Sequence, residues 1–73
     1  MRVQSVMRGV VVGTIDPQSQ GRVMVQVPGM GPMWAPVCQP FGKGGGMPAT
    51  GGEVVVAFEG GDLNRPIVLG SLG

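Results

Sequence analysis

Hydrophobic residues recur at every second position along much of the chain, and valine is the commonest of them. A period of two, carried by β-branched residues, predicts β-strands, whereas a helix would show a period near 3.6. The first predicted strand runs from about Arg8 to Ile15, with Val10 and Val12 on the same face. The second, Arg22 to Val27, has valine at alternate positions, so one of its faces is predicted to lie in a core.

Three further strands are predicted in the second half of the chain. A short strand around Met33 to Cys38 contains Pro36, which has no backbone N–H for a ladder and indicates an edge position or a bulge. The fourth strand, Glu53 to Glu59, is apolar on both faces at its centre and is expected to be covered on both sides. The fifth runs from Ile67 to Leu72.

Glycine and proline dominate the connections between these strands. Turn chemistry ends the first strand at residues 16–21 and the second at residues 28–32. Residues 40–52 have no periodicity and form a loop that is long for a compact domain, so we expect it to be functional or ordered by a partner. Residues 1–8 are interpreted as an N-terminal extension.

Five short strands without a substantial helix predict an all-β fold over residues 1–73, in a single domain. A small antiparallel barrel is favoured because closure removes exposed sheet edges, which a valine-rich chain would otherwise use to aggregate. The OB-fold and the SH3-like barrel are the two candidates. The pattern of residues alone does not separate them.

Composition adds an argument for assembly. The chain holds 15 glycines and 7 prolines, but it is 42% hydrophobic, which opposes disorder. Only 12% of its residues are charged, compared with about 25% in typical globular chains. Its single cysteine, Cys38, and its lack of histidine exclude an internal disulfide and a zinc site built from Cys and His. We expect no cofactor, and we expect the excess apolar surface to contact another chain.

The charges and the start of the chain exclude other classes. Five basic and four acidic side chains give a net charge of +1, and the basic residues are spread singly, whereas nucleic-acid binding needs them clustered. No apolar run reaches the length of a signal peptide or a membrane span. Synthesis in a cytoplasm, without membrane insertion, is the expectation.

A run of motifs in the second half of the chain resembles a known family. It comprises Glu53-Val54-x-Val56-x-Phe58, a Gly61-Asp62 turn, Arg65-Pro66 and Val68-x-Gly70-x-Leu72. Upstream, Gly9 to Gly13, Asp16-Pro17, Gly21 to Pro28 and Trp34 to Val37 match in the same order. Together they are similar to the OB-fold domain of phage baseplate assembly protein V, which contractile-tail spike proteins and the VgrG proteins of type VI secretion share.

The resemblance implies a structural role without catalysis. In the family, three OB domains surround the threefold axis between a hub and a spike. We expect neither a hub domain nor a spike within these 73 residues, because the OB-like motifs occupy nearly all of them. The expectation is therefore a virion tail or baseplate protein, a homotrimeric junction module that contacts separate hub and spike proteins.

Two groups of residues are candidate sites. Gly61, Asp62, Arg65 and Pro66 form a predicted turn, in which an ion pair between Asp62 and Arg65 would brace the hairpin. The second group combines methionines and aromatic residues, most of them in the loops. It either plugs the barrel ends or forms a subunit interface, because Met and Trp are enriched in interface cores. Its members are Met30, Met33, Trp34, Phe41 and Met47.

Two rival functions are weaker. A nucleic-acid-binding OB module could stack bases on Trp34 and Phe41, but the sequence offers no basic groove beside them. An enzyme would need a nucleophile, a base or a metal site, and the chain offers four dispersed carboxylates, one Cys and no His. The glycines around Lys43 lack the spacing of a phosphate-binding loop. A structural protein remains the favoured interpretation.

Overall fold

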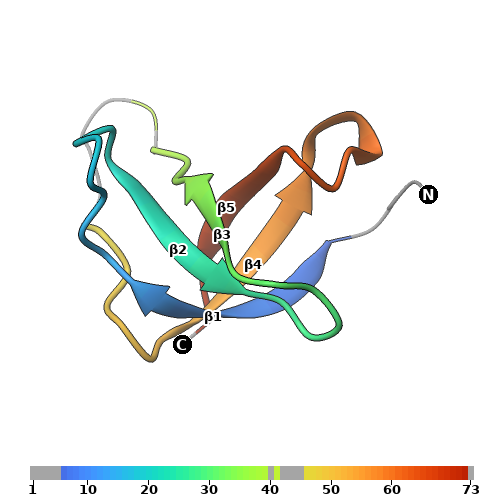
Figure 1. Cartoon of the computed structure of the whole chain (residues 1–73), viewed down its shortest axis with the longest axis horizontal. Coiled ribbons are helices and arrows are strands. Elements are labelled where there is room, and N and C mark those ends of the chain that lie inside the picture. The colour runs from blue at the N-terminus through green and yellow to red at the C-terminus, as the bar shows by residue number, and fades with distance from the viewer. Residues whose placement is uncertain (1–5, 40, 42–45, 73) are drawn as a thin grey trace.

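A computed structural model of the chain describes residues 6–39, 41 and 46–72. Five strands form one antiparallel sheet in the order β3-β2-β1-β4-β5. Their bounds are β1 Met7–Gly13, β2 Arg22–Gln26, β3 Met33–Pro36, β4 Glu53–Phe58 and β5 Pro66–Ser71. The sheet curls into a partly open barrel, with β1 crossing its base and β4 rising from it (Figure 1).

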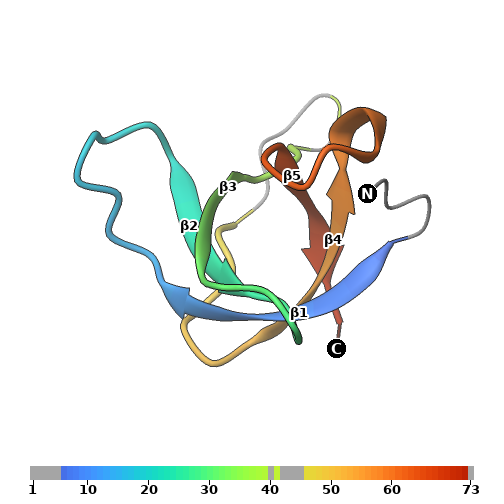
Figure 2. The same ribbon diagram turned by 45° about the vertical axis from the view of Figure 1, so that its right-hand side comes forward.

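The order of the strands separates the two barrel candidates. Strand β1 pairs with both β2 and β4, and β3 lies beside β5 through a parallel bridge between Val37 and Val68. This is a five-stranded Greek-key arrangement, as in the OB-fold. Figure 2 shows the resulting cup, with β2 and β3 on one side of β1 and β4 and β5 on the other. We call the line where β3 meets β5 the seam.

The predicted all-β fold is confirmed, with small shifts at the ends of the strands. β1 ends at Gly13, and Ile15, which the pattern placed in the strand, is 86% exposed. β3 ends at Pro36, and beyond it Val37 keeps only an isolated bridge. β5 begins one residue early, at Pro66. A one-turn 3-10 helix over Glu59–Gly61 is the only helical element of the described residues.

The core is formed by the alternate positions of the strands that the sequence predicted to face inward. The buried apolar side chains come from all five strands and from the turn after β2, and most are valine, which suits a pleated, crowded interior. They are Val11, Val23, Val25, Val27, Ala35, Val54, Val56, Phe58 and Val68. Met7, Met30, Met33, Val37 and Leu63 pack against them from the margins. The core is therefore thin and filled largely by small branched side chains.

Two β-bulges bend the sheet into its curl. In β1 the register with β2 shifts between Val11 and Gly13, which leaves Val12 as the extra residue. In β5 the register with β4 shifts between Val68 and Gly70, which leaves Leu69 as the extra residue. Val12 and Leu69 are both 47% exposed. Each bulge thus places an apolar side chain on the outside of the barrel.

Gly9 gives a test of how closely the strands approach. A Cβ atom at Gly9 would lie 3.2 Å from the backbone oxygen of Gln26 and 3.3 Å from Val27 Cγ2, whereas one at Gly13 would lie 3.6 Å from Met24 Cβ. We expect Gly9→Ala to lower the free energy of unfolding by roughly 1–3 kcal/mol, because the backbone oxygen cannot yield as a side chain can. Gly13→Ala should change it by less than about 0.5 kcal/mol. Equal losses in urea unfolding of the two variants would contradict the close approach.

Candidate functional site

The turn between β4 and β5 is held mainly by its backbone. Gly60 and Gly61 have positive φ values of 63° and 77°, a region that favours glycine. The Asp62 N–H donates to the Glu59 oxygen, and the Arg65 N–H donates to the Asp62 oxygen. The Asp62 carboxylate accepts the Asn64 N–H at 2.9 Å, which is the local bond that Asp commonly makes in turns. These contacts give Asp62 a turn-forming role.

The predicted ion pair within this turn is different in the structure. Arg65 Nη2 lies 3.6 Å from Glu59 Oε2, so its carboxylate partner is Glu59 rather than Asp62. One carboxylate oxygen of Asp62 already accepts the Asn64 N–H. Glu59 lies directly before the two glycines of the turn, on the opposite side of the turn from Arg65. Both side chains of the pair are more than half exposed. Such a pair adds little stability, so the glycines and backbone bonds hold the turn.

A second charged cluster lies in the turn between β1 and β2, and the sequence reasoning missed it. The Asp16 carboxylate is buried and accepts Arg22 Nε at 2.9 Å and Nη2 at 3.0 Å. It also accepts the backbone N–H groups of Gln18 and Gln20, at 2.9 and 3.0 Å. The Arg22 guanidinium, aided by these N–H groups, holds the pKa of Asp16 well below its usual range. Among the residues that the structure describes, Asp16 is the one polar residue that is buried.

The same arginine reaches the outer face of β3. The Arg22 guanidinium carbon lies 5.6 Å from the centre of the Trp34 ring, in a cation–π contact. Both residues line an open groove of about 340 Å³, together with Pro36. The opposite wall consists of Glu59 and residues 64–67. We call this the seam groove, because its walls belong to the two sides of the seam.

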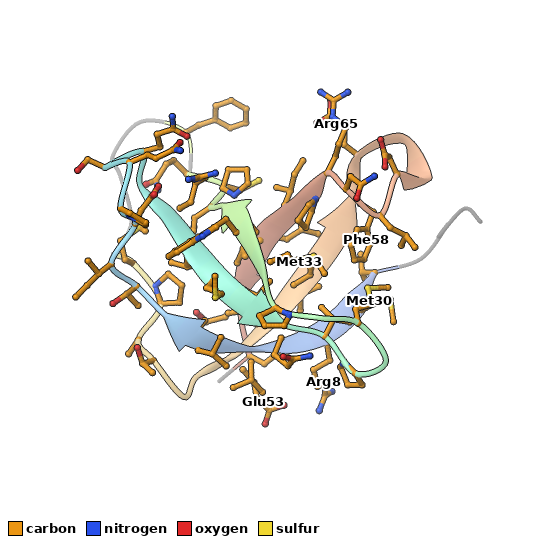
Figure 3. The ribbon with its side chains drawn as sticks, viewed as in Figure 1. Arg8, Met30, Met33, Glu53, Phe58 and Arg65 are labelled. Atoms are coloured by element: carbon orange, nitrogen blue, oxygen red, sulfur yellow. The ribbon has the colours of Figure 1, made fainter. Side chains whose placement is uncertain are left out.

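The predicted interface residues do not form one cluster. Met30 and Met33 are partly buried and pack against the core (labelled in Figure 3). The Gln26 amide donates to the Met30 oxygen, which ties this loop to β2. Phe41 and Met47 are exposed, and Trp34 is half-buried in the seam groove. Met30 and Met33 therefore lie at the edge of the core, whereas Phe41 and Met47 are open to contact with another chain.

Apolar side chains also cover the outside of β1, β4 and β5. The outward positions of these adjacent strands alternate with the buried ones and bear few charges. We define the outer apolar face as Val10, Val55, Ala57, Ile67, Leu69 and Leu72, all exposed or half-buried. Arg8 and Glu53 lie on the same face and pair at 3.5 Å, as Figure 3 shows at the lower edge. No described element of the chain covers this face, although the pattern of β4 predicted cover on both sides.

The structure adds two observations on other site classes. Within residues 6–39, 41 and 46–72, no three acidic or cysteine side chains gather as metal ligands would. No helix in that part of the chain has the length and hydrophobicity to cross a membrane.

Comparison with known proteins identifies the family. The model of the OB domain of type VI secretion systems and phage-baseplate injectors matches residues 7–72, which is nearly the whole chain. A comparison with curated proteins gave no match. The strand order of the barrel agrees with this family's fold, and the domain is a structural part of baseplates and spikes. The chain therefore belongs to the family of injector OB domains found in phage baseplates and type VI secretion systems.

Proposed function

We propose that the chain acts as a homotrimeric junction module between the hub and the spike of a phage tail tip or a related injection device. The observation that carries this proposal is the outer apolar face, which is exposed to water in a single copy. Only 12% of the residues are charged, so the chain has few polar side chains with which to cover it. A soluble monomer rarely exposes a contiguous patch of this kind. Family membership supports a structural role in the tail. Threefold symmetry is the expectation that the resemblance to phage baseplate assembly protein V implies.

Association would supply the buried area that one small copy lacks. A domain of this size buries only about 60% of the surface of its unfolded chain and is marginal alone. Burying the outer apolar face against neighbouring copies adds apolar area at about 25 cal/mol per Å². The Arg8–Glu53 pair within the face would supply a polar contact that fixes the orientation of the copies. The module's role is thus mechanical and needs no reacting group.

Leu69→Glu tests the interface without touching the core. Leu69 is 47% exposed and occupies the bulge of β5, so its replacement leaves the ladder and the interior unchanged. In a trimer, the new carboxylate would be buried without a partner, which costs several kcal/mol. We expect the wild type to sediment as a trimer in analytical ultracentrifugation and the variant to need at least about 100-fold higher concentration to associate.

Ile15→Glu is the matched control, because it also exchanges an apolar residue for Glu but lies in the loop after β1, outside the outer apolar face. It should remain a trimer, and circular dichroism should show both variants folded. The proposal fails if the wild type is a stable monomer at micromolar concentration, including after the neighbouring tail proteins are added. It also fails if folded Leu69→Glu associates as the wild type does.

A further inference from the structure

A second groove, of about 330 Å³, runs over β1 on the outside of the barrel. Gly9 and Val10 of β1 lie in it. Because β1 stands between β2 and β4 in the sheet, the walls of the groove come from the end of β2 and the start of β4. We call it the β1 groove. Its lining residues are Arg8, Gly9, Val10, Gln26, Pro28 and Glu53.

The polar side chains of the β1 groove already have partners within the chain. The Gln26 amide donates to two backbone oxygens of the turn that follows β2. Arg8 and Glu53 pair with each other at 3.5 Å, and Figure 3 labels both at the lower edge of the barrel. The groove therefore presents mainly apolar surface to an occupant and holds no unpaired charge that would attract an ion. An aliphatic side chain from another chain suits such a surface.

A ring of three copies needs two different contact surfaces on each copy, because one surface meets a different surface of the neighbour. The outer apolar face cannot supply both, since packing of the same surface against itself gives a twofold dimer. The β1 groove is continuous with one flank of that face, because Val10 belongs to both. Leu69 lies on the opposite flank, because β4 stands between β1 and β5 in the sheet.

Leu69 is suited to enter a groove of a neighbouring copy. It is the extra residue of the β5 bulge, which places its side chain on the outside of the barrel, where it is 47% exposed. The residues on both sides of it pair with β4, so its backbone is held before any contact forms. A side chain that is positioned in advance loses less conformational entropy on binding.

We propose that Leu69 of each copy inserts into the β1 groove of the next copy, so that three such contacts close the ring. The inference rests on the proposed trimer and adds which two surfaces meet. The Arg8–Glu53 pair then lies at the margin of each contact, where charged groups are tolerated. Val55 and Ala57, on the outside of β4 between the two surfaces, face the threefold axis.

Disulfide cross-linking tests which surfaces meet. All variants carry Cys38→Ser, which removes the exposed free thiol. Leu69→Cys and Pro28→Cys are made separately and refolded together, so that any link between the two sites joins two copies. We expect covalent dimers on a non-reducing denaturing gel, and a shift from one chain to three when both substitutions are in the same chain. Ile15→Cys in place of Pro28→Cys is the matched control, because Ile15 is 86% exposed but lies outside both surfaces, and it should give no dimers.

Sedimentation of the same samples, with circular dichroism to verify folding, separates failure of this contact from failure of the trimer. Trimers that give no dimers, or no more than the Ile15→Cys control gives, would overturn the contact and leave the trimer standing. Dimers of Leu69→Cys with itself would show that the outer apolar face packs against itself, which also overturns the contact. A chain that sediments as a monomer and forms no dimers would overturn both proposals.

Discussion

Phe58→Ala is expected to unfold the isolated chain at room temperature or leave it close to its midpoint. Phe58 is 7% exposed and is the one aromatic side chain among the buried residues of the core, against which Met30 and Met33 pack (labelled in Figure 3). Removing a buried phenyl ring costs about 3–5 kcal/mol, because the cavity that remains is only partly filled. A domain of this size has little more stability than that to lose. Urea unfolding followed by circular dichroism measures the effect.

Phe41→Ala is the matched control, since Phe41 is fully exposed in the described structure. Its replacement should change the free energy of unfolding by less than about 0.5 kcal/mol. Similar losses in the two variants would show that Phe41 packs into the fold and would contradict the thin core described above. A loss in Phe41→Ala only where the chain is associated would instead assign Phe41 to an interface, as the sequence predicted.

Asp16→Asn should lower the melting temperature by about 10 °C, the second large effect. Asparagine keeps one of the two oxygens that accept the backbone N–H groups of Gln18 and Gln20, and it loses the charge that holds Arg22. The guanidinium is then left over Trp34 without its carboxylate. Glu53→Gln is the control, because the exposed Arg8–Glu53 pair is worth little, and a shift below about 2 °C is expected. Equal shifts in the two variants would contradict the structural role of Asp16.

The Asp16–Arg22 pair also predicts that the stability of the fold depends on pH. The pKa of Asp16 is depressed in the folded chain, mainly by Arg22, so its contribution is complete above the ordinary Asp pKa of about 3.9 and is lost as the pH falls toward the depressed value. The difference in melting temperature between the wild type and Asp16→Asn should therefore be constant from pH 7 to about 5 and narrow below about 4. A difference that is unchanged at pH 2 would show that the charge of Asp16 is not what stabilises the turn.

Strand positions were predictable because each strand carries its own pattern. Valine at alternate positions from Val23 to Val27 defines the buried face of β2 without any knowledge of the neighbouring strands. The ends of the strands were less predictable, because they depend on long-range pairing. Ile15 continues the apolar pattern of β1, but β2 begins only after the turn that Asp16 organises, and no partner strand lies opposite Ile15.

The site was harder to predict than the fold. Asp16 and Arg22 are six residues apart, and their spacing indicates a turn but does not show that the carboxylate is buried beneath the guanidinium. Asp62 and Arg65 are closer in sequence, yet their side chains have other partners. The walls of the seam groove come from strands at opposite ends of the sheet order, so only closure of the barrel brings Trp34 near Arg65. The bulges that produce this closure have no clear signal in the sequence.

The seam has a consequence for how the barrel would respond to force. Around most of the barrel, load is shared by antiparallel ladders of several residue pairs each. Across the seam, the described residues are joined by the Val37–Val68 bridge, in which the Cys38 N–H donates to the Val68 oxygen at 2.9 Å. Tension around the barrel would therefore open it first along this line, while the other ladders keep their register. We expect the seam to be the first part of the barrel to separate under load, because it has fewer backbone bonds than the ladders on either side of it.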